Sequence, residues 1–403
     1  MPAAINISYK YNVSLQFIIN GDLVVIDQEN IKSVNINRKY DTSNSPVVYI
    51  TMKMTEVIYA RLLDNQTNSY AILDIDKYDS SGDNKFKTKY IKDNFIYIMP
   101  TDINYKKLAL DNETIDNSTD SDSDTDYFTI SFALLKMDIF NDNKTMINSI
   151  VKKSNNISII NHYFCDHKMA IEQFDYNDIF DTLIIPPIKS KTGLLQYLNN
   201  NHSFYESGDY RFFMDFDVFY LLSNKGNYVN NGDNQYHTVI INVDNEDYNA
   251  NVLAGSAIDY DSKSYILNVS SKRANLNIDK YKSKSFNSIL GVDTDGNTKQ
   301  ISLDLPLNED DDMKLDIKRV PNGNLNYINK IKYGEQMSTV ILDVTKTEID
   351  NAILTPNKEY IVHNYSSYSE YDGRYILSYK KEMFVQISGD FLCITSFGLR
   401  KVD

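Results

Sequence analysis

The sequence predicts a mainly β protein with a few short helices, divided into several domains. Tyrosine (31) and phenylalanine (18) are abundant among the 403 residues, and apolar and polar side chains alternate in many short runs. Aromatic and β-branched residues favour strands, and the frequent Asn, Asp and Gly between these runs favour turns. A chain of this length exceeds one ordinary core, so we expect about two to four domains.

Residues 1–140 are expected to form a first barrel-like β domain. Apolar and polar residues alternate over 13–17 and again after a turn at Gly21–Asp22, so a hairpin opens the chain. Thr55 is a good N-cap for a short helix over 57–63, and strand patterns flank that helix on both sides. Strands wrapped around one helix indicate a barrel-like domain.

Residues 141–226 are expected to form a helix–strand segment, of which 183–226 would complete the first domain. Ser190 and Thr192 offer N-cap hydroxyls ahead of apolar residues spaced for about two helical turns. Alternation over 211–222 then predicts one long strand. Its two faces carry Met214, Phe216, Val218, Tyr220 and Leu222 on one side and Phe213, Asp215, Asp217, Phe219 and Leu221 on the other. So apolar a strand must be covered on both sides, by its own core and by a second domain or a neighbouring subunit.

The remaining chain predicts two further β domains. Residues 227–308 have turn residues at short intervals between strand-like runs, which is typical of a small all-β domain. The acidic stretch Glu309–Asp312 is the best linker candidate. Residues 313–403 contain five strand-like runs with a possible helical turn near 347–352, which again suits a small barrel. No strict repeat is present, yet the first and last regions are candidates for two versions of one fold.

Composition and charge exclude several classes of protein. The net charge of −14 argues against a protein that grips nucleic acid, because phosphate binding needs clustered Lys and Arg. The basic patch formed by Lys272, Arg273 and Lys280–Lys284 is better explained as a solvated loop or a contact with an acidic partner. Cys165 and Cys393 lie far apart, which argues against a disulfide scaffold and fits assembly in a reducing cytoplasm. No signal-like start and no apolar run of about 20 residues is present, so we expect no membrane anchor.

Three segments contain residues of the kinds that bind metal ions. His162, Cys165 and His167 are closely spaced, but a structural zinc site needs about four ligands and no partner pair follows. Asp293–Asn297 begins like a calcium loop whose continuation fails, and a hairpin turn explains it better. The acidic segment 110–126 is interpreted as an exposed loop rather than a calcium-binding repeat. We therefore expect no metal and no cofactor.

Catalytic patterns are also missing from the sequence. No nucleophile elbow, P-loop, dinucleotide fingerprint or zinc-protease motif is found. Asp215 and Asp217 lie two residues apart, like a carboxylate pair, but acid–base catalysis needs two carboxyl groups facing each other across a cleft. We expect both to face a polar interface or solvent. The sequence thus predicts no catalytic residue and no enzyme.

Two stretches resemble a known family. Over 183–226, Pro-Pro is followed by a capped leucine helix, Phe-Tyr, an aromatic strand containing Phe-Phe-Met-Asp-Phe-Asp, and Tyr-Leu-Leu-Ser before a Gly turn. Over 350–381, the runs LTPNKEYIV and GRYILSYKKEMF stand out. Both resemble the central baseplate hub protein of contractile-tailed bacteriophages. This resemblance implies two tube-like β-barrel domains, in 1–140 and 313–403, that mimic subunits of the tail tube.

The resemblance also implies a function. A homotrimer would present six tube-like domains and so join a sixfold tail tube to a threefold central spike. The implied partners are the tail tube or tube-initiator protein, the spike protein and the baseplate wedge proteins, with DNA passing through the lumen without specific binding. The implied location is the virion tail baseplate, assembled in the host bacterial cytoplasm. A receptor-binding or carbohydrate-binding tail protein is the alternative, and a tail-attached cell-wall hydrolase is a third.

Overall fold

The protein is described from a computed structural model. The residues that the structure describes are 9–40, 46–79, 88–101, 127–205, 210–215, 217–224, 238–244, 256–259, 264–270, 274–280, 288–292, 298–302, 338–347, 354–356, 358–364 and 371–402. Strands dominate these residues and the helices are short, so the prediction of a mainly β, multidomain protein is confirmed. None of the helices in these ranges has the length and apolar character that a membrane crossing requires.

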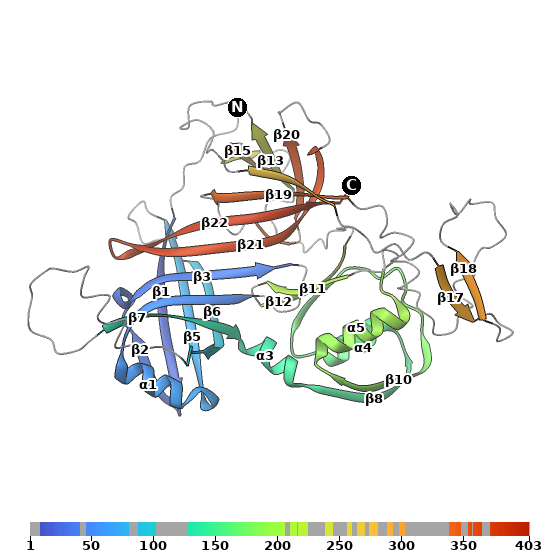
Figure 1. Cartoon of the computed structure of the whole chain (residues 1–403), viewed down its shortest axis with the longest axis horizontal. Helices are drawn as coiled ribbons and strands as arrows, with labels where there is room; N and C mark the ends of the chain where they lie inside the picture. Colours follow the sequence, from blue (N-terminus) through green and yellow to red (C-terminus); the bar gives the residue numbers. More distant parts are fainter. Residues whose placement is uncertain are drawn as a thin grey trace, which may run out of the picture.

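A closed antiparallel barrel of eight strands forms the first β unit (Figure 1). In order around the barrel these are β1 (Tyr9–Ile19), β5 (Ser69–Asp79), β6 (Thr88–Ile98), β7 (Tyr127–Lys136), β4 (Val47–Thr55), β3 (Ile31–Lys39), β21 (Gly373–Ile387) and β22 (Asp390–Lys401). Pairing of Tyr11 with Phe391 closes the ring between β1 and β22. We expected 183–226 to complete this barrel, whereas the strands that complete it are β21 and β22, from the other end of the chain.

The barrel's local structure follows the sequence closely. β1 and β2 (Asp22–Ile26) form the expected opening hairpin, with positive φ at Asn20 and Gly21, one residue earlier than the expected turn. The predicted helix is α1 (Glu56–Asp64), and the Thr55 hydroxyl accepts a hydrogen bond from the Ile58 N–H. The short 3₁₀ turn η1 (Gln28–Asn30) lies between β2 and β3, and η2 (Gln66–Asn68) lies between α1 and β5.

The second β unit extends the same sheet beyond the barrel. Its own strands are β13 (Thr238–Asp244), β14 (Ser256–Asp259), β15 (Ser264–Ser270), β16 (Ala274–Lys280), β19 (Ser338–Thr347) and β20 (Glu359–Asn364). β20 pairs with β21 and β19 pairs with β22, so the long β21–β22 hairpin belongs to both units. β17 (Ser288–Val292) and β18 (Thr298–Ser302) form a separate hairpin. The division into four domains, and the closure of this second unit into a barrel, remain predictions.

Two hydrophobic cores share the β21–β22 hairpin. Phe384 and Phe391 lie in the core of the barrel. Tyr375 and Phe397, on the same two strands, lie in the core of the second unit. A register shift between Leu377 and Tyr379 marks the passage from one core to the other.

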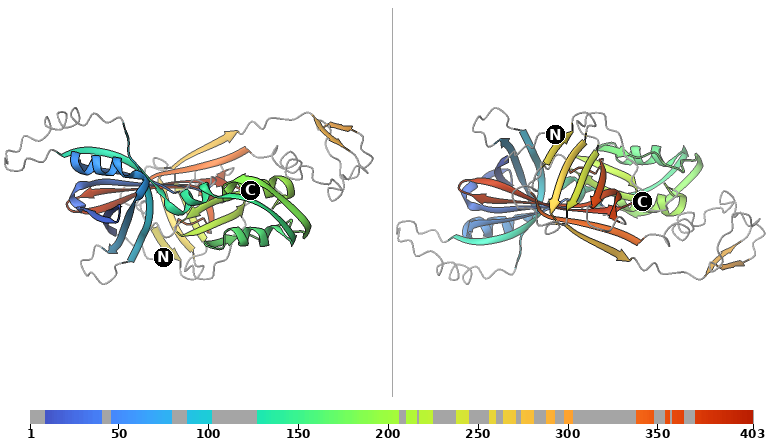
Figure 2. Two further views of the ribbon diagram at one scale, coloured as in Figure 1. Left: turned by 90° about the horizontal axis from the view of Figure 1, so that it is seen from below. Right: turned by 90° about the horizontal axis from the view of Figure 1, so that it is seen from above.

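Residues 137–223 form a third, helix–strand unit beside the barrel, coloured green in Figure 2. Its elements are α3 (Met137–Lys144), β8 (Met146–Ser154), α4 (Asn156–Tyr163), β9 (Lys168–Ile171), β10 (Phe180–Lys189), α5 (Lys191–His202), β11 (Tyr210–Asp215) and β12 (Val218–Ser223). Ser190 caps α5 as predicted, because its hydroxyl accepts from the Gly193 N–H at 3.0 Å. β8 and β10 form a two-stranded sheet, and β9, β11 and β12 form a three-stranded one.

The expected single strand over 211–222 is wrong, because β11 and β12 form a tight antiparallel hairpin instead. Directly opposite residues share a face, so Met214 pairs with Phe219 rather than lying on the side of Tyr220. One face joins the core of the second unit through Phe213, Tyr220 and Leu222, and the other joins the helix–strand core through Phe212, Met214, Phe219 and Leu221. The prediction that both faces must be covered is confirmed, and in both cases the chain itself provides the cover.

Candidate functional site at the junction of the β units

The candidate site is the junction where the β21–β22 hairpin passes between the two cores. Tyr379 lies at the bulge, and a Cβ atom on Gly398 of β22 would overlap its ring. Only glycine therefore fits beside Tyr379 at this position. The Tyr379 hydroxyl donates to Asp343 Oδ1 of β19 at 2.8 Å. Burial raises the pKa of Tyr379, and the hydrogen bond to the carboxylate raises it further.

A buried ionic cluster lies next to this bulge. Arg38 of β3 forms ion pairs with Asp215 of β11, at 3.0 Å between Nε and Oδ1, and with Glu382 of β21. Lys380 Nζ lies 3.7 Å from Glu382 and donates to the carbonyl of Leu354 at 2.9 Å. All four charged residues are at most 2% exposed. The cluster thus connects the barrel, the second unit and the helix–strand unit.

Two positive and two negative charges balance one another in this cluster. Tyr90 of β6 donates to Glu382, which satisfies a further oxygen of the buried carboxylate. Burial, and then the charge of Asp215, raises the pKa of Tyr40 well above its ordinary value. Its backbone N–H donates to the carbonyl of Ser378 at 2.8 Å. Removing one member of such a cluster leaves an uncompensated buried charge, so the cluster fixes one arrangement of the three units.

Hydrogen bonds from two arginines also hold the β21–β22 hairpin near the bulge. Arg211 of β11 donates to the carbonyl of Leu377 at 3.4 Å. Arg400 of β22 donates to the side chain of Asn224 at 3.1 Å. These contacts approach the hairpin from the side of β11 and β12. The side chains of Arg211 and Arg400 thus make structural contacts at the junction.

The two aspartates that the sequence singled out separate in the structure. Asp215 is buried in the ionic cluster, where it faces Arg38 at a polar interface between units. Asp217 follows the end of β11, is exposed and pairs with Lys168 of β9. The hydrogen bond from Lys168 lowers the pKa of Asp217. The tight turn of the hairpin sends these side chains to different surroundings.

The closely spaced His162, Cys165 and His167 do not form a common site. His167 Nε2 lies 3.0 Å from Asp142 Oδ2, and Lys191 Nζ lies 3.0 Å from Asp142 Oδ1, which ties α3 to the start of α5. Cys165 is a free, exposed thiol. Across the part of the chain that the structure describes, no group of three or more His, Cys, Asp or Glu residues has an arrangement that would hold a metal ion.

Several segments that the sequence singled out lie outside the residues that the structure describes. These are the acidic segment 110–126, Lys272 and Arg273, the lysines after Lys280, the possible calcium loop Asp293–Asn297, and the linker Glu309–Asp312.

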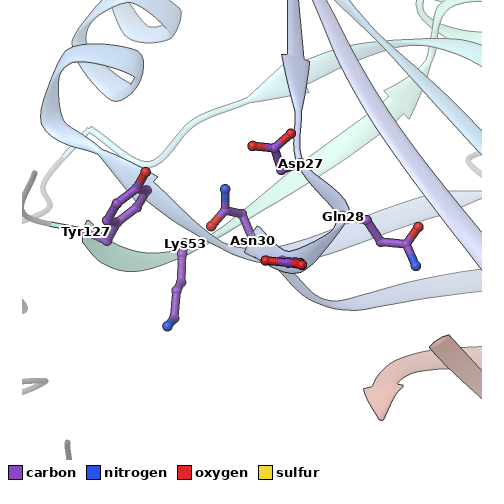
Figure 3. A pocket seen from close by; sticks show the side chains of 6 residues that line it. Asp27, Gln28, Asn30, Lys53 and Tyr127 are labelled. Atoms are coloured by element: carbon purple, nitrogen blue, oxygen red, sulfur yellow. The ribbon is translucent and has the colours of Figure 1, made fainter. Parts of the chain in front are cut away.

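A hollow of about 620 Å³ lies near the end of β2 (Figure 3). It is lined by Asp27, Gln28, Glu29, Asn30, Lys53 and Tyr127. Gln28 donates to the carbonyl of Gly389 at 2.9 Å, so its amide helps to hold the tip of the β21–β22 hairpin. The Lys53 and Tyr127 side chains diverge in Figure 3 rather than pointing to one centre. This arrangement has no nucleophile–base pair.

Of the charged residues of the junction, sequence reasoning singled out Asp215 and missed Arg38, Lys380 and Glu382. Arg38 continues the buried phase of Val34 and Ile36, and Glu382 shares the buried phase of Phe384. A charge at an inward position of a strand pattern is the signal that was available. Its partners were not, because they come from elements far apart in the sequence.

Comparisons with known proteins give structural matches only. No family model matches the chain, and no curated protein matches its sequence. The fold is similar to the tail protein from Neisseria meningitidis MC58 (TM-score 0.48, 10% identity, 97% of each chain covered). It is also similar to the 43 kDa tail protein of prophage MuSo2 from Shewanella oneidensis (TM-score 0.49, 10% identity, 97% of this chain and 99% of that chain). A third similar structure is the E. coli c3393 protein, a type VI secretion component with similarity to T4 tail proteins gp27 and gp5 (TM-score 0.40, 8% identity, 91% and 73% covered).

Proposed function

We propose that this protein is a structural component of a phage or phage-like contractile tail baseplate, where it forms a trimeric hub that joins the tail tube to the central spike. The observation that supports this most is the shared β21–β22 hairpin, which holds two β units of one chain in a fixed relation. The resemblance of 183–226 and 350–381 to the baseplate hub family supports a place in a contractile tail.

The shared hairpin suits a ring-shaped hub that must resist mechanical force. Rotating one unit against the other would break ladder hydrogen bonds that both strands make to the second unit, and also the hydrogen bond from Lys380 to the carbonyl of Leu354 in the core of that unit. Three such chains would provide six walls, which reconciles a sixfold tube with a threefold spike. We therefore propose the tube or tube-initiator protein, the spike and the wedge proteins as partners.

The net charge of −14 supports a passive role toward DNA. Carboxylates on a lumen would repel the phosphate backbone and let a duplex slide. A location in the virion tail baseplate, after assembly in the host bacterial cytoplasm, belongs to the same proposal.

The alternative is a receptor-binding or carbohydrate-binding tail protein. Exposed aromatic platforms would favour it. Several tyrosines of the described chain are instead almost fully buried in the cores, namely Tyr40, Tyr97, Tyr205, Tyr360 and Tyr375. This distribution favours an architectural role.

The test is the mass of the purified protein in solution, combined with electron microscopy of the particles. We expect a trimer at high concentration and rings with a central hole, with no lytic activity on peptidoglycan. A particle that stays monomeric at every concentration and shows no ring would contradict the hub, and glycan binding by that monomer would support the alternative.

A further inference from the structure

The two-stranded sheet of β8 and β10, called the ribbon below, leaves one apolar face uncovered. Met146, Ile150 and Ile184 are 69%, 65% and 64% exposed. The next residues along each strand, Ile147 and Leu183, are buried against α4 and α5 in the helix–strand core. The ribbon therefore has one face in a core and a second face with the same apolar character open to solvent.

These exposed residues form a cluster. Ile150 and Ile184 lie directly opposite each other in the ladder, and Met146 lies on the same face, four residues from Ile150. Single exposed apolar residues are ordinary on a protein surface. The exposed Ile150–Ile184 cross-strand pair, with Met146 on the same face beyond the polar Asn148, is a larger apolar surface and indicates an interaction site.

Lysines lie at both ends of this face. Lys189 is opposite Met146, and Lys152 is opposite Thr182. Asp181 is one residue out of phase with Thr182 and Ile184, on the other side of the ladder. Along the described ladder the open face thus has an apolar centre between two cations, and its chemistry complements an apolar stripe between carboxylates.

The strand edges indicate that the partner covers the face rather than extending the sheet. Pro186 and Pro187 on β10 lack the N–H groups that a further strand would need. Lys152 and Lys153 on β8 are charges of the kind that discourage edge pairing. From Met146 to Lys152 the face is about 20 Å long, which a helix of about 13 residues spans.

We propose that the open face of the ribbon is the docking site of an amphipathic helix from another protein, with an apolar stripe flanked by Asp or Glu. Each described helix of this chain already packs its apolar side into a core, as Leu62 in α1, Ile139 in α3, Ile160 in α4 and Leu195 in α5 show, and Val57 of α1 is a single exposed apolar residue. A second copy therefore offers no free apolar helix among these four. The proposal goes beyond the hub function, since this site lies outside the junction and its partner is a different protein.

The probe is a fluorescent synthetic peptide of about 16 residues, with leucines on one helical face flanked by glutamates. Its binding to the full-length protein is measured by anisotropy. A peptide with lysine in place of every glutamate is the matched control. We expect the acidic peptide to bind and the basic peptide to bind at least about tenfold more weakly.

Two variants locate the site. Ile150→Glu places a carboxylate in the apolar centre and is expected to weaken binding of the acidic peptide by about tenfold or more. Val57→Glu makes the same kind of change at a residue that is 78% exposed on α1, and we expect unchanged affinity. Hydrogen exchange with bound peptide should slow in β8 and β10 and not in α1.

Three outcomes would overturn the proposal. The first is that both peptides bind equally well or that neither binds. The second is that Val57→Glu also abolishes binding of the acidic peptide. The third is peptide-free self-association that Ile150→Glu abolishes, which would make a second copy the occupant. Particle mass and ring formation of Ile150→Glu separate this test from the hub proposal, because we expect both to be unchanged.

Discussion

Arg38 continues the alternation of its strand, yet its buried charge connects different units of the molecule. It occupies an inward position of β3, where the neighbouring inward residues are Val34 and Ile36. Its partners Asp215 and Glu382 come from distant parts of the chain. The alternation of β3 was readable from the sequence, but a buried cation gives no hint of which carboxylates will meet it. The Ser190 and Thr55 caps were predictable because each hydroxyl lies three residues before the backbone N–H that donates to it.

Arg38→Ala is expected to lower the free energy of unfolding by about 3–5 kcal/mol, because Asp215 and Glu382 lose their buried partner. Chemical denaturation measures this. The control is Arg61→Ala, which removes the exposed ion pair with Asp22 and should cost less than about 1 kcal/mol. Equal costs for the two variants would show that the cluster is not an energetic joint.

Gly398→Ala is expected to destabilise the protein by about 1–3 kcal/mol, because the new methyl group overlaps the Tyr379 ring. Truncating the ring in the double variant Gly398→Ala/Tyr379→Ala should recover part of that cost. Denaturation of the four proteins in this double-mutant cycle measures the coupling. Simple additivity of the two single changes would refute the steric explanation.

Tyr78 provides a pH-dependent test at the barrel seam. Burial and, next, its hydrogen bond to Asp390 together raise the pKa of Tyr78 to about 12. Since the folded pKa exceeds the usual value near 10, stability from this group is complete below pH 10 and is lost as the pH rises toward 12. NMR of ¹³Cζ-labelled tyrosine, assigned with Tyr78→Phe, measures the titration. Asp390→Asn should shift it downward, and a Tyr78 signal titrating near 10 in the unmodified protein would contradict this account.

At the scale of single elements, periodicity predicted the existence of strands better than their limits. The apolar run over 211–222 reads as one strand because alternation continues through its middle. The structure folds it into β11 and β12, and the reversal moves Tyr220 and Leu222 to the face of Phe213. Alternation shows which residues share a face within β11 and within β12. How the two strands lie relative to each other depends on the turn between them, and no glycine marks that turn in the sequence.

The hairpin predicts a stability effect without an assembly effect. Phe213→Ala should lower the free energy of unfolding by about 3–5 kcal/mol, because Phe213 is fully buried against Tyr40 and Tyr220. Particle mass at native conditions should be unchanged. Ile179→Ala, at a residue 70% exposed, is the control and should cost little. A stable Phe213→Ala protein with a changed particle mass would place Phe213 at a subunit contact instead.

At the scale of the whole molecule, the joining of the two β units was beyond the reach of the sequence. The barrel-like character of 1–140 was visible, but its completion by β21 and β22 depends on pairing of β3 with β21 across most of the chain. Sequence patterns contain no information on such partners when several strands have similar alternation. The resemblance over 350–381 pointed to a second unit there and gave no sign that the same strands serve both.

The shared hairpin predicts cooperative unfolding of both β units. Phe384→Ala in the first core and Phe397→Ala in the second should each lower the same calorimetric transition, because both residues lie on β21–β22. Hydrogen exchange in β4, which lies in the first unit, should accelerate in Phe397→Ala as well. Two separate transitions, each sensitive to only one of these changes, would show that the units unfold independently.

The position of β21 and β22 in the chain has a consequence for biosynthesis. A ribosome completes β7 first and must then polymerise residues 137–372 before β21 emerges, which takes roughly 10–50 s at about 5–20 residues per second. During that interval β3 of the nascent barrel has no neighbour on the side that β21 later occupies, and β1 is paired on its β22 side only with β2, over Leu15–Ile19. Open strand edges of this kind recruit chaperones or aggregate, so the yield of intact protein should depend on how quickly translation reaches the last strands.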